Sequence, residues 1–274
     1  MRNLRWTTSA DREVFSSNAT GEDQMRQRVS GLPSSVFMLL LVTATAAAAA
    51  CPAEFPDNAT LAVRLQNAAT GTGVSPALGP NTSAGGLFGG QRMWAALVNR
   101  NGALCNFTTS KSDPTQVWPG SQAIAKAKAY TVNAFSLDAL ALSTARLYTL
   151  TQPGHSLFGL NNSNPFNPGL LTPPIPGAGD GTTIAGGIIT FGGGVGLYNS
   201  SGQIIGGLGV SGDTACADHE VAKRVRDLSG LNPPGGPLVD DIIYSPPPSV
   251  FAHPVCVNTL KNGVFIGNET ATPP

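Results

Sequence analysis

The sequence predicts an α+β domain, an antiparallel sheet of about five strands with helices packed on it. Two hairpin signals carry this prediction. Residues 99–102 (Asn-Arg-Asn-Gly) separate apolar segments at 93–98 and 103–107, and Asn-Gly accepts the left-handed backbone of a tight turn. Residues 199–202 separate segments 194–198 and 203–210 in the same way. Because helical segments lie between hairpins and do not alternate with single strands, we expect an antiparallel sheet.

The remaining elements follow from periodicity and from breaking residues. Residues 60–69 place apolar side chains at helical spacing, with Asn58 or Thr60 as the cap. The alanine-rich stretch Ser121–Phe135 predicts a second helix, residues 137–150 a third that Pro153 ends, and residues 218–228 the last. One further strand is expected at 184–189.

The first fifty residues are expected to lie outside the fold. Basic residues at 25–28 precede the apolar run SVFMLLLVTATAAAAA, which ends in small residues near Ala50 and is typical of a signal peptide. Because the polar stretch before Met25 does not suit a signal peptide, we expect translation to start at Met25; an interior apolar helix is the alternative. Residues 51–274 are then one domain with a proline-rich C-terminal extension from about 232.

The sequence also predicts a secreted, glycosylated protein. Seven N-x-S/T acceptor motifs occur, beginning at Asn18, Asn58, Asn81, Asn106, Asn161, Asn199 and Asn268. A lipid anchor at Cys51 is the minor alternative, because Ala48 stands where a lipoprotein signal has a larger aliphatic residue. The apolar run is too short to predict a membrane span.

The charge of the mature segment argues against nucleic-acid partners. From Cys51 onward the chain has eleven basic and twelve acidic residues, without a basic cluster. Binding to nucleic acid requires clustered positive charge. We therefore expect neither nucleic acid nor an anionic membrane surface as a partner.

Four cysteines predict two disulfides in an exported chain. Four cysteines allow three connectivities. Cys216, before the last helix, and Cys256, in the tail, form a natural pair that would hold the extension on the domain, and Cys51 with Cys105 follows by elimination. A metal site is the rival interpretation, but no C-x-x-C or H-x-x-x-H spacing supports it.

The glycine-rich segment at 206–212 has two interpretations. Bare glycine Cα atoms at Gly209 and Gly212, before a helix N-terminus, suit close approach to a ligand. The same glycines also suit close packing between strand and helix. No hydrolase elbow, P-loop or dinucleotide fingerprint accompanies them, so no catalytic constellation is visible.

Histidines are the candidate metal or iron ligands. We expect His219 in the first, partly exposed turn of the last helix, where a neutral imidazole is a good donor. His155 follows the third predicted helix beside apolar residues that suit a flat cofactor face. His253 is expected to pack under the Cys216–Cys256 disulfide.

Two separated motifs resemble the GlcG/HbpS/PduO C-terminal family (DUF336). The segment GGVGLYNSSGQIIGGLGVSGDTACADHEVAKRVRDLSGL, from 193 to 231, is similar to its glycine-rich strand and acidic helix. SQAIAKAKAYTVNAF resembles its A-x-x-K-A-x-T-A-x-x-F helix at Ala125, Lys128, Ala129, Thr131 and Phe135, with Val132 where the family has Ala. The resemblance implies the α+β fold, helix-mediated homo-oligomers and, in haem-binding members, a threonine at the haem, here Thr131.

The leading hypothesis is a secreted binding module for haem or a related tetrapyrrole. Its ligand would lie between the glycine-rich strand and the helices carrying Lys128, Thr131 and His219. One alternative is an enzyme that acts on a small organic acid or a tetrapyrrole, with His219 as acid/base beside Asp218. Another is a structural or assembly protein without a ligand.

Overall fold

The computed structural model describes residues 50–171, 177–244 and 249–270. The expected signal peptide and Met25 start lie outside these residues. Within them, no helix combines the length and the apolar composition needed to cross a membrane.

The five strands of the main sheet are β1 (Trp94–Asn99), β2 (Leu104–Thr109), β3 (Gly177–Ala178), β4 (Gly194–Tyr198) and β5 (Ile204–Ser211). Their order is β3-β2-β1-β5-β4 and every pairing is antiparallel, as the hairpin signals predict. Short pairs follow in the C-terminal extension: β6 (Ile243–Tyr244) with β7 (Ala252–His253), and β8 (Thr259–Lys261) with β9 (Val264–Gly267).

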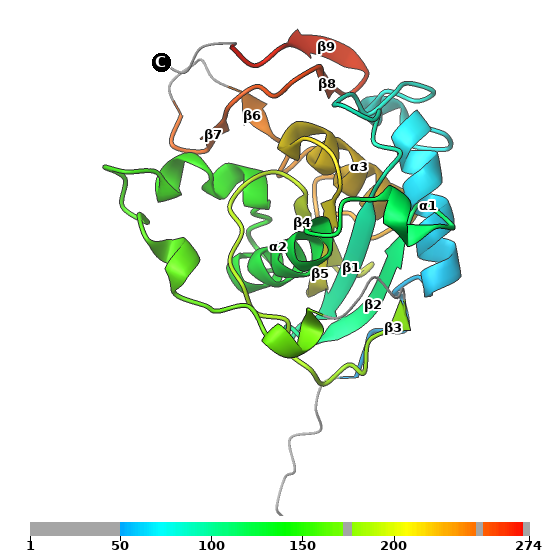
Figure 1. Ribbon diagram of the computed structural model, residues 1–274, viewed down its shortest axis with the longest axis vertical. Coiled ribbons are helices and arrows are strands. Elements are labelled where there is room, and N and C mark those ends of the chain that lie inside the picture. The colour runs from blue at the N-terminus through cyan, green and yellow to red at the C-terminus, as the bar shows by residue number, and fades with distance from the viewer. Residues whose placement is uncertain (1–49, 172–176, 245–248, 271–274) are drawn as a thin grey trace, which may run out of the picture. The chain divides into compact units, whose positions relative to one another are not determined.

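Helices cover both faces of the sheet (Figure 1). The helix α2 (Ser121–Phe135) packs on β5 and β1, while α1 (Asn58–Thr70) and α3 (Ala215–Leu228) lie on the opposite face. Alternation along β1 divides the core accordingly, because successive strand side chains point to opposite faces. Trp94 and Ala96 belong to the cluster under α2, whereas Ala95 and Leu97 belong to the cluster under α1 and α3.

Two expected elements are wrong. Residues 137–150 do not form an α-helix; they contain a tight turn and the 3₁₀ turns Thr144–Leu147 and Thr149–Thr151. The Ser143 and Thr144 hydroxyls donate instead to the carbonyls of Asp240 and Phe191, so long-range contacts override helical periodicity. Residues 184–189 form only isolated bridges, because Gly186 and Gly187 take left-handed φ values of 64° and 79° that end an extended strand.

Two helix starts also differ from expectation. The cap of α1 is Asp57, whose carboxylate accepts from the Thr60 amide, so neither Asn58 nor Thr60 caps it. The helix α3 begins at Ala215, and the Thr214 hydroxyl accepts from the Ala217 amide. His219 therefore lies in the second turn of α3 and is fully buried, not partly exposed in the first turn.

Candidate functional site

The glycines of β4 and β5 form the surface on which α2 lies. The pairs Gly194–Gly209 and Gly196–Gly207 stand opposite each other in the sheet. A Cβ on Gly209 would lie 2.0 Å from the Ala125 carbonyl oxygen, and one on Gly207 would lie 2.3 Å from that of Ala129. Of the two sequence interpretations, close strand-to-helix packing accounts for this geometry.

Gly212 has a similar structural cause at the end of β5. A Cβ there would lie 1.9 Å from the Arg92 carbonyl oxygen, so the chain before β1 requires a bare Cα. In the described part of the chain, three surface hollows lie beside α1, beside α2 and at residues 203–205, and neither Gly209 nor Gly212 lines any of them.

Lys128 and Asp218 form a buried ion pair between α2 and α3. Lys128 Nζ lies 2.7 Å from Asp218 Oδ2, donates to the Val210 carbonyl at 3.1 Å and stands over the Phe191 ring. Burial lowers the pKa of Lys128, and burial raises the pKa of Asp218 to about 6 against the attraction of the lysine. Two hydrogen-bond acceptors and one aromatic ring surround the ammonium, so Lys128 connects the layers of the fold.

His219 belongs to a buried group of charged residues under the extension. Its Nε2 lies 3.6 Å from Asp241 Oδ1, beyond hydrogen-bond distance, and neither ring nitrogen has a hydrogen-bond partner within the described residues. Burial opposes ionisation of Asp241, but His219 and Lys223 beside it hold the pKa of that carboxyl well below its usual range. This position gives His219 no direct access to solvent.

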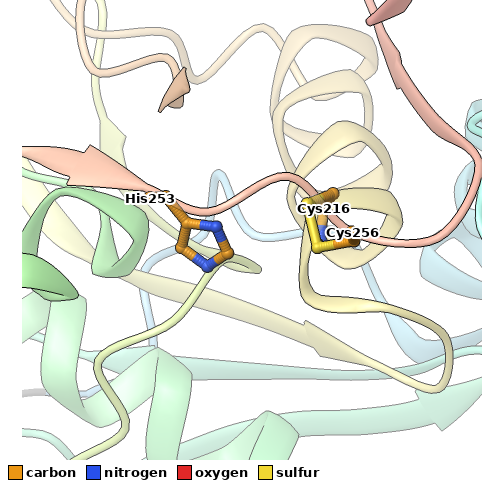
Figure 2. Close-up of side chains that lie close together, drawn as sticks. All are labelled: Cys216, His253 and Cys256. Atoms are coloured by element: carbon orange, nitrogen blue, oxygen red, sulfur yellow. A yellow bond between two sulfur atoms is a disulfide. The ribbon is translucent and has the colours of Figure 1, made fainter. Parts of the chain in front are cut away.

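Both predicted disulfides are present. Cys216–Cys256 ties α3 to the C-terminal extension, and Cys51–Cys105 ties the N-terminal arm to β2. None of the four cysteines is free. As expected, His253 packs beside the Cys216–Cys256 bond, and Figure 2 shows its ring facing the two sulfur atoms.

The group formed by Cys216, Cys256 and His253 does not suit a metal ion. Thiolates are the metal-binding form of cysteine, and both sulfurs are bonded to each other. The His253 Nδ1 lies 2.7 Å from the Pro254 carbonyl and must donate to it, while Nε2 accepts from the Gly192 amide. Burial lowers the pKa of His253 to about 4, so the imidazole is neutral with both nitrogens engaged.

An open hollow of about 420 Å³ lies beside α2. It is on the side of the helix away from the glycines of β4 and β5. We call it the α2 groove. Its lining is mainly apolar, with a cluster of asparagine amides, and consists of Ala123, Ile124, Ala127, Asn161, Asn162, Asn164, Pro165, Phe166, Gly187, Ile188 and Ile189. Such a lining, apolar with a few polar groups, is typical of small-molecule sites.

Thr131 supports the α2 groove from beneath. Its side chain is fully buried; the hydroxyl donates to the Ala127 carbonyl at 2.7 Å and accepts from the Ile189 amide at 3.0 Å. It thereby joins α2 to the wall at 187–189. The structure places Thr131 behind the groove wall and Lys128 and His219 in the interior. The ligand roles expected for these three residues stay predictions.

Two other residues bear on this site. His155 is exposed in the loop before the asparagines and is not part of the lining. Sequence reasoning missed Tyr130, whose hydroxyl lies 3.3 Å from Asn164 Oδ1 at the groove. The contact joins a helix to a loop 34 positions away, which no local pattern in the sequence indicates.

The fold and the groove define a class of protein: a three-layer α+β domain with an open, mainly apolar groove beside α2. The profile of the family described as "Haem degrading protein HbpS-like" matches residues 83–227. Because the match covers more than half of the chain, the protein belongs to the HbpS-like family.

Solved structures of the same kind show distant similarity. Klebsiella pneumoniae ORFY, a DUF336 protein, shares 22% identity over 62% of this chain and 85% of its own, with a TM-score of 0.41. A haem complex of PduOC shares 26% over 49% and 76% of the two chains, with a TM-score of 0.35. A Streptomyces reticuli HbpS double mutant shares 18% over 66% and 94%, with a TM-score of 0.33. No curated protein matches the chain significantly.

Proposed function

We propose that the protein is a secreted module that binds haem or a related tetrapyrrole in the α2 groove. The observation that carries the proposal is the groove itself, which lies within the segment matched by the haem-related family profile. Its volume of about 420 Å³ is within the range of small-molecule pockets.

The residues present fit a tetrapyrrole. Ile124, Phe166 and Ile189 offer apolar surface to a flat macrocycle. Removing the apolar surface of the macrocycle and of these side chains from water is favourable. The amides of Asn162 and Asn164 can donate to carboxylates at the edge of such a ring. Bound haem would supply an iron centre at this surface.

A haemin titration followed by the Soret band tests the proposal. Ile124→Asp places a carboxylate in the apolar lining and should weaken haemin binding at least about tenfold, because a charge is costly to bury. Val63→Asp is the matched control, since Val63 is 54% exposed on α1 outside the groove. Equal affinity of both variants, or no binding by the wild type, would contradict the proposal.

Haem degradation is a second candidate, because the family description names it. Asp218 and His219, the expected acid/base pair, are 1% and 0% exposed, so any such chemistry would need groups at the groove. Loss of the Soret band under air with an electron donor, and its persistence without one, would indicate turnover beyond binding.

Secretion is supported by the two disulfides, since these bonds persist in oxidising compartments. Mass spectrometry of exported protein should find an N-terminus near Cys51 and glycans on exposed acceptors such as Asn81 and Asn268. A homo-oligomer, implied by the family resemblance, stays a prediction that light scattering checks.

A further inference from the structure

A second hollow, also of about 420 Å³, lies beside α1 and shares no lining residue with the α2 groove. We call it the α1 hollow. It is bounded by the last turn of α1, the chain before β1 and the chain after β2. Its lining is mainly polar, unlike that of the α2 groove, and consists of Gln66, Ala69, Thr70, Gln91, Ser110, Lys111 and Ser112.

Hydrogen bonds fix the walls of the α1 hollow. The Gln66 side-chain amide donates to the Ser110 carbonyl at 3.0 Å and joins α1 to the chain after β2. The Ser110 hydroxyl donates to the Gln91 carbonyl and accepts from the Met93 amide, both at 2.9 Å. Because these walls are ordered before a ligand arrives, binding costs less conformational entropy.

Lys111 brings a positive charge without a partner to this hollow. The chain has five lysines, and four of them donate to a carbonyl or a carboxylate: Lys126, Lys128, Lys223 and Lys261. Lys111 is partly buried, and its ammonium has no hydrogen bond or ion pair within the described residues. The α1 hollow therefore has a cation available for a ligand.

The groups around Lys111 do not neutralise this charge. Asp113 is the acid nearest in sequence, and its carboxylate accepts from the amide and the hydroxyl of Thr115 at 2.9 and 2.7 Å. The C-terminal end of α1 carries partial negative charge, but its Ala68 carbonyl accepts from the Arg224 guanidinium at 3.0 Å.

We propose that the α1 hollow binds a small sugar acid, a carboxylate whose carbon chain carries hydroxyl groups. The Lys111 ammonium pairs with the carboxylate, one cation with one negative charge. The side chains of Gln91 and Ser112, without hydrogen-bond partners in the described part of the chain, offer donors and acceptors to the hydroxyls. Because the hollow is separate from the α2 groove, binding there does not depend on a tetrapyrrole.

Isothermal titration calorimetry of the full chain with D-gluconate tests the site. D-Glucitol is the neutral counterpart, in which an alcohol replaces the carboxylate, and it should bind at least about tenfold more weakly. Lys111→Gln removes the charge and should weaken gluconate binding at least about tenfold, without changing the affinity for glucitol. Arg64→Gln is the matched control, because Arg64 is a partly buried cation on α1 outside the lining.

Nuclear magnetic resonance locates the bound gluconate. Its addition should shift the backbone amide signals of Lys111 and Ser112 and leave that of Ile124 in the α2 groove unchanged. No gluconate binding by the wild type would overturn the site. Equal losses in Lys111→Gln and Arg64→Gln would assign the effect to net charge and overturn it too. Displacement by equimolar chloride would mean an adventitious ion only. Porphyrin titration of the same variants reports on the α2 groove separately.

Discussion

Lys128 on α2 and Asp218 on α3 meet across the end of the sheet, with Nζ and Oδ2 2.7 Å apart and both side chains at most 1% exposed. The pair joins the helices on opposite faces of the sheet. Its lysine also donates to β5, and its carboxylate accepts from the Asp213 amide. The two family motifs noted in the sequence therefore meet at one interior contact.

Stability should depend on pH through Asp218. Burial raises the pKa of this carboxyl from 3.8 to about 6 in the folded protein. The folded protein then binds the proton more tightly than the unfolded chain, so the contribution is full below 3.8 and is lost as the pH rises through about 6. Relative to Asp218→Asn, the wild type should lose on the order of 2–3 kcal/mol between these limits. Urea unfolding at several pH values measures this; a constant difference would contradict it.

Removing only the lysine should be costly. Lys128→Met leaves the Asp218 carboxylate buried without its cation, which costs about 3–5 kcal/mol. The double variant Lys128→Met/Asp218→Asn should recover much of this loss. Lys126→Met is the control on the same helix, because Lys126 donates to the Leu170 carbonyl and no ion pair is broken. Urea unfolding of the wild type, Lys128→Met, Asp218→Asn and the double variant measures the coupling, with Lys126→Met beside them. Additive losses would show that the pair is not coupled.

Gly209 should not tolerate even alanine. Its added Cβ would lie 2.0 Å from the Ala125 carbonyl oxygen, so α2 would have to move off the sheet. We expect Gly209→Ala to lower the free energy of unfolding by more than about 3 kcal/mol. Gly120→Ala is the control, since nothing lies within 4 Å of its added Cβ. Wild-type melting of Gly209→Ala would refute the close packing.

The Cys216–Cys256 disulfide should stabilise the whole domain. Replacing both residues by serine opens a link between positions 40 apart and should cost about 2–4 kcal/mol in the free energy of unfolding. Calorimetry of the variant and the wild type gives this difference. An unchanged melting temperature would mean that the extension is held by its other contacts, such as the Asn262 amide on Glu220.

The sequence predicted the parts of the fold that local chemistry decides. The two glycine-containing hairpin turns, the alanine-rich helix and the cysteine pairs specify structure within a few residues or by elimination, and the structure confirms them. The failed helix at 137–150 depends on Ser143 and Thr144 bonding to Asp240 and Phe191, which no local pattern shows.

The site was predictable only in part, for the same reason. The family resemblance implies Thr131 at a ligand, which stays a prediction. Its hydrogen bond to the Ile189 amide depends on packing that the sequence does not display. The helix α3 starts at Ala215, three residues before the expected start at 218, and this places His219 in the second turn and not in the exposed first turn. The groove itself arises from loop residues 161–166 and 187–189 folding beside α2.

Thr131→Val should distinguish a wall support from an iron ligand. The change is nearly isosteric but removes the hydroxyl that joins the Ala127 carbonyl to the Ile189 amide. The buried hydrogen bond from the Ile189 amide to the Thr131 hydroxyl is lost, which should lower the free energy of unfolding by about 1 kcal/mol. Haemin binding should weaken several-fold, because the groove wall at 187–189 is then held less firmly to α2. The Soret maximum should stay in place, because the Thr131 hydroxyl bonds to the backbone behind the groove wall. Haemin titration and urea unfolding measure the two effects. A shifted Soret maximum with unchanged stability would instead place the Thr131 oxygen at the iron.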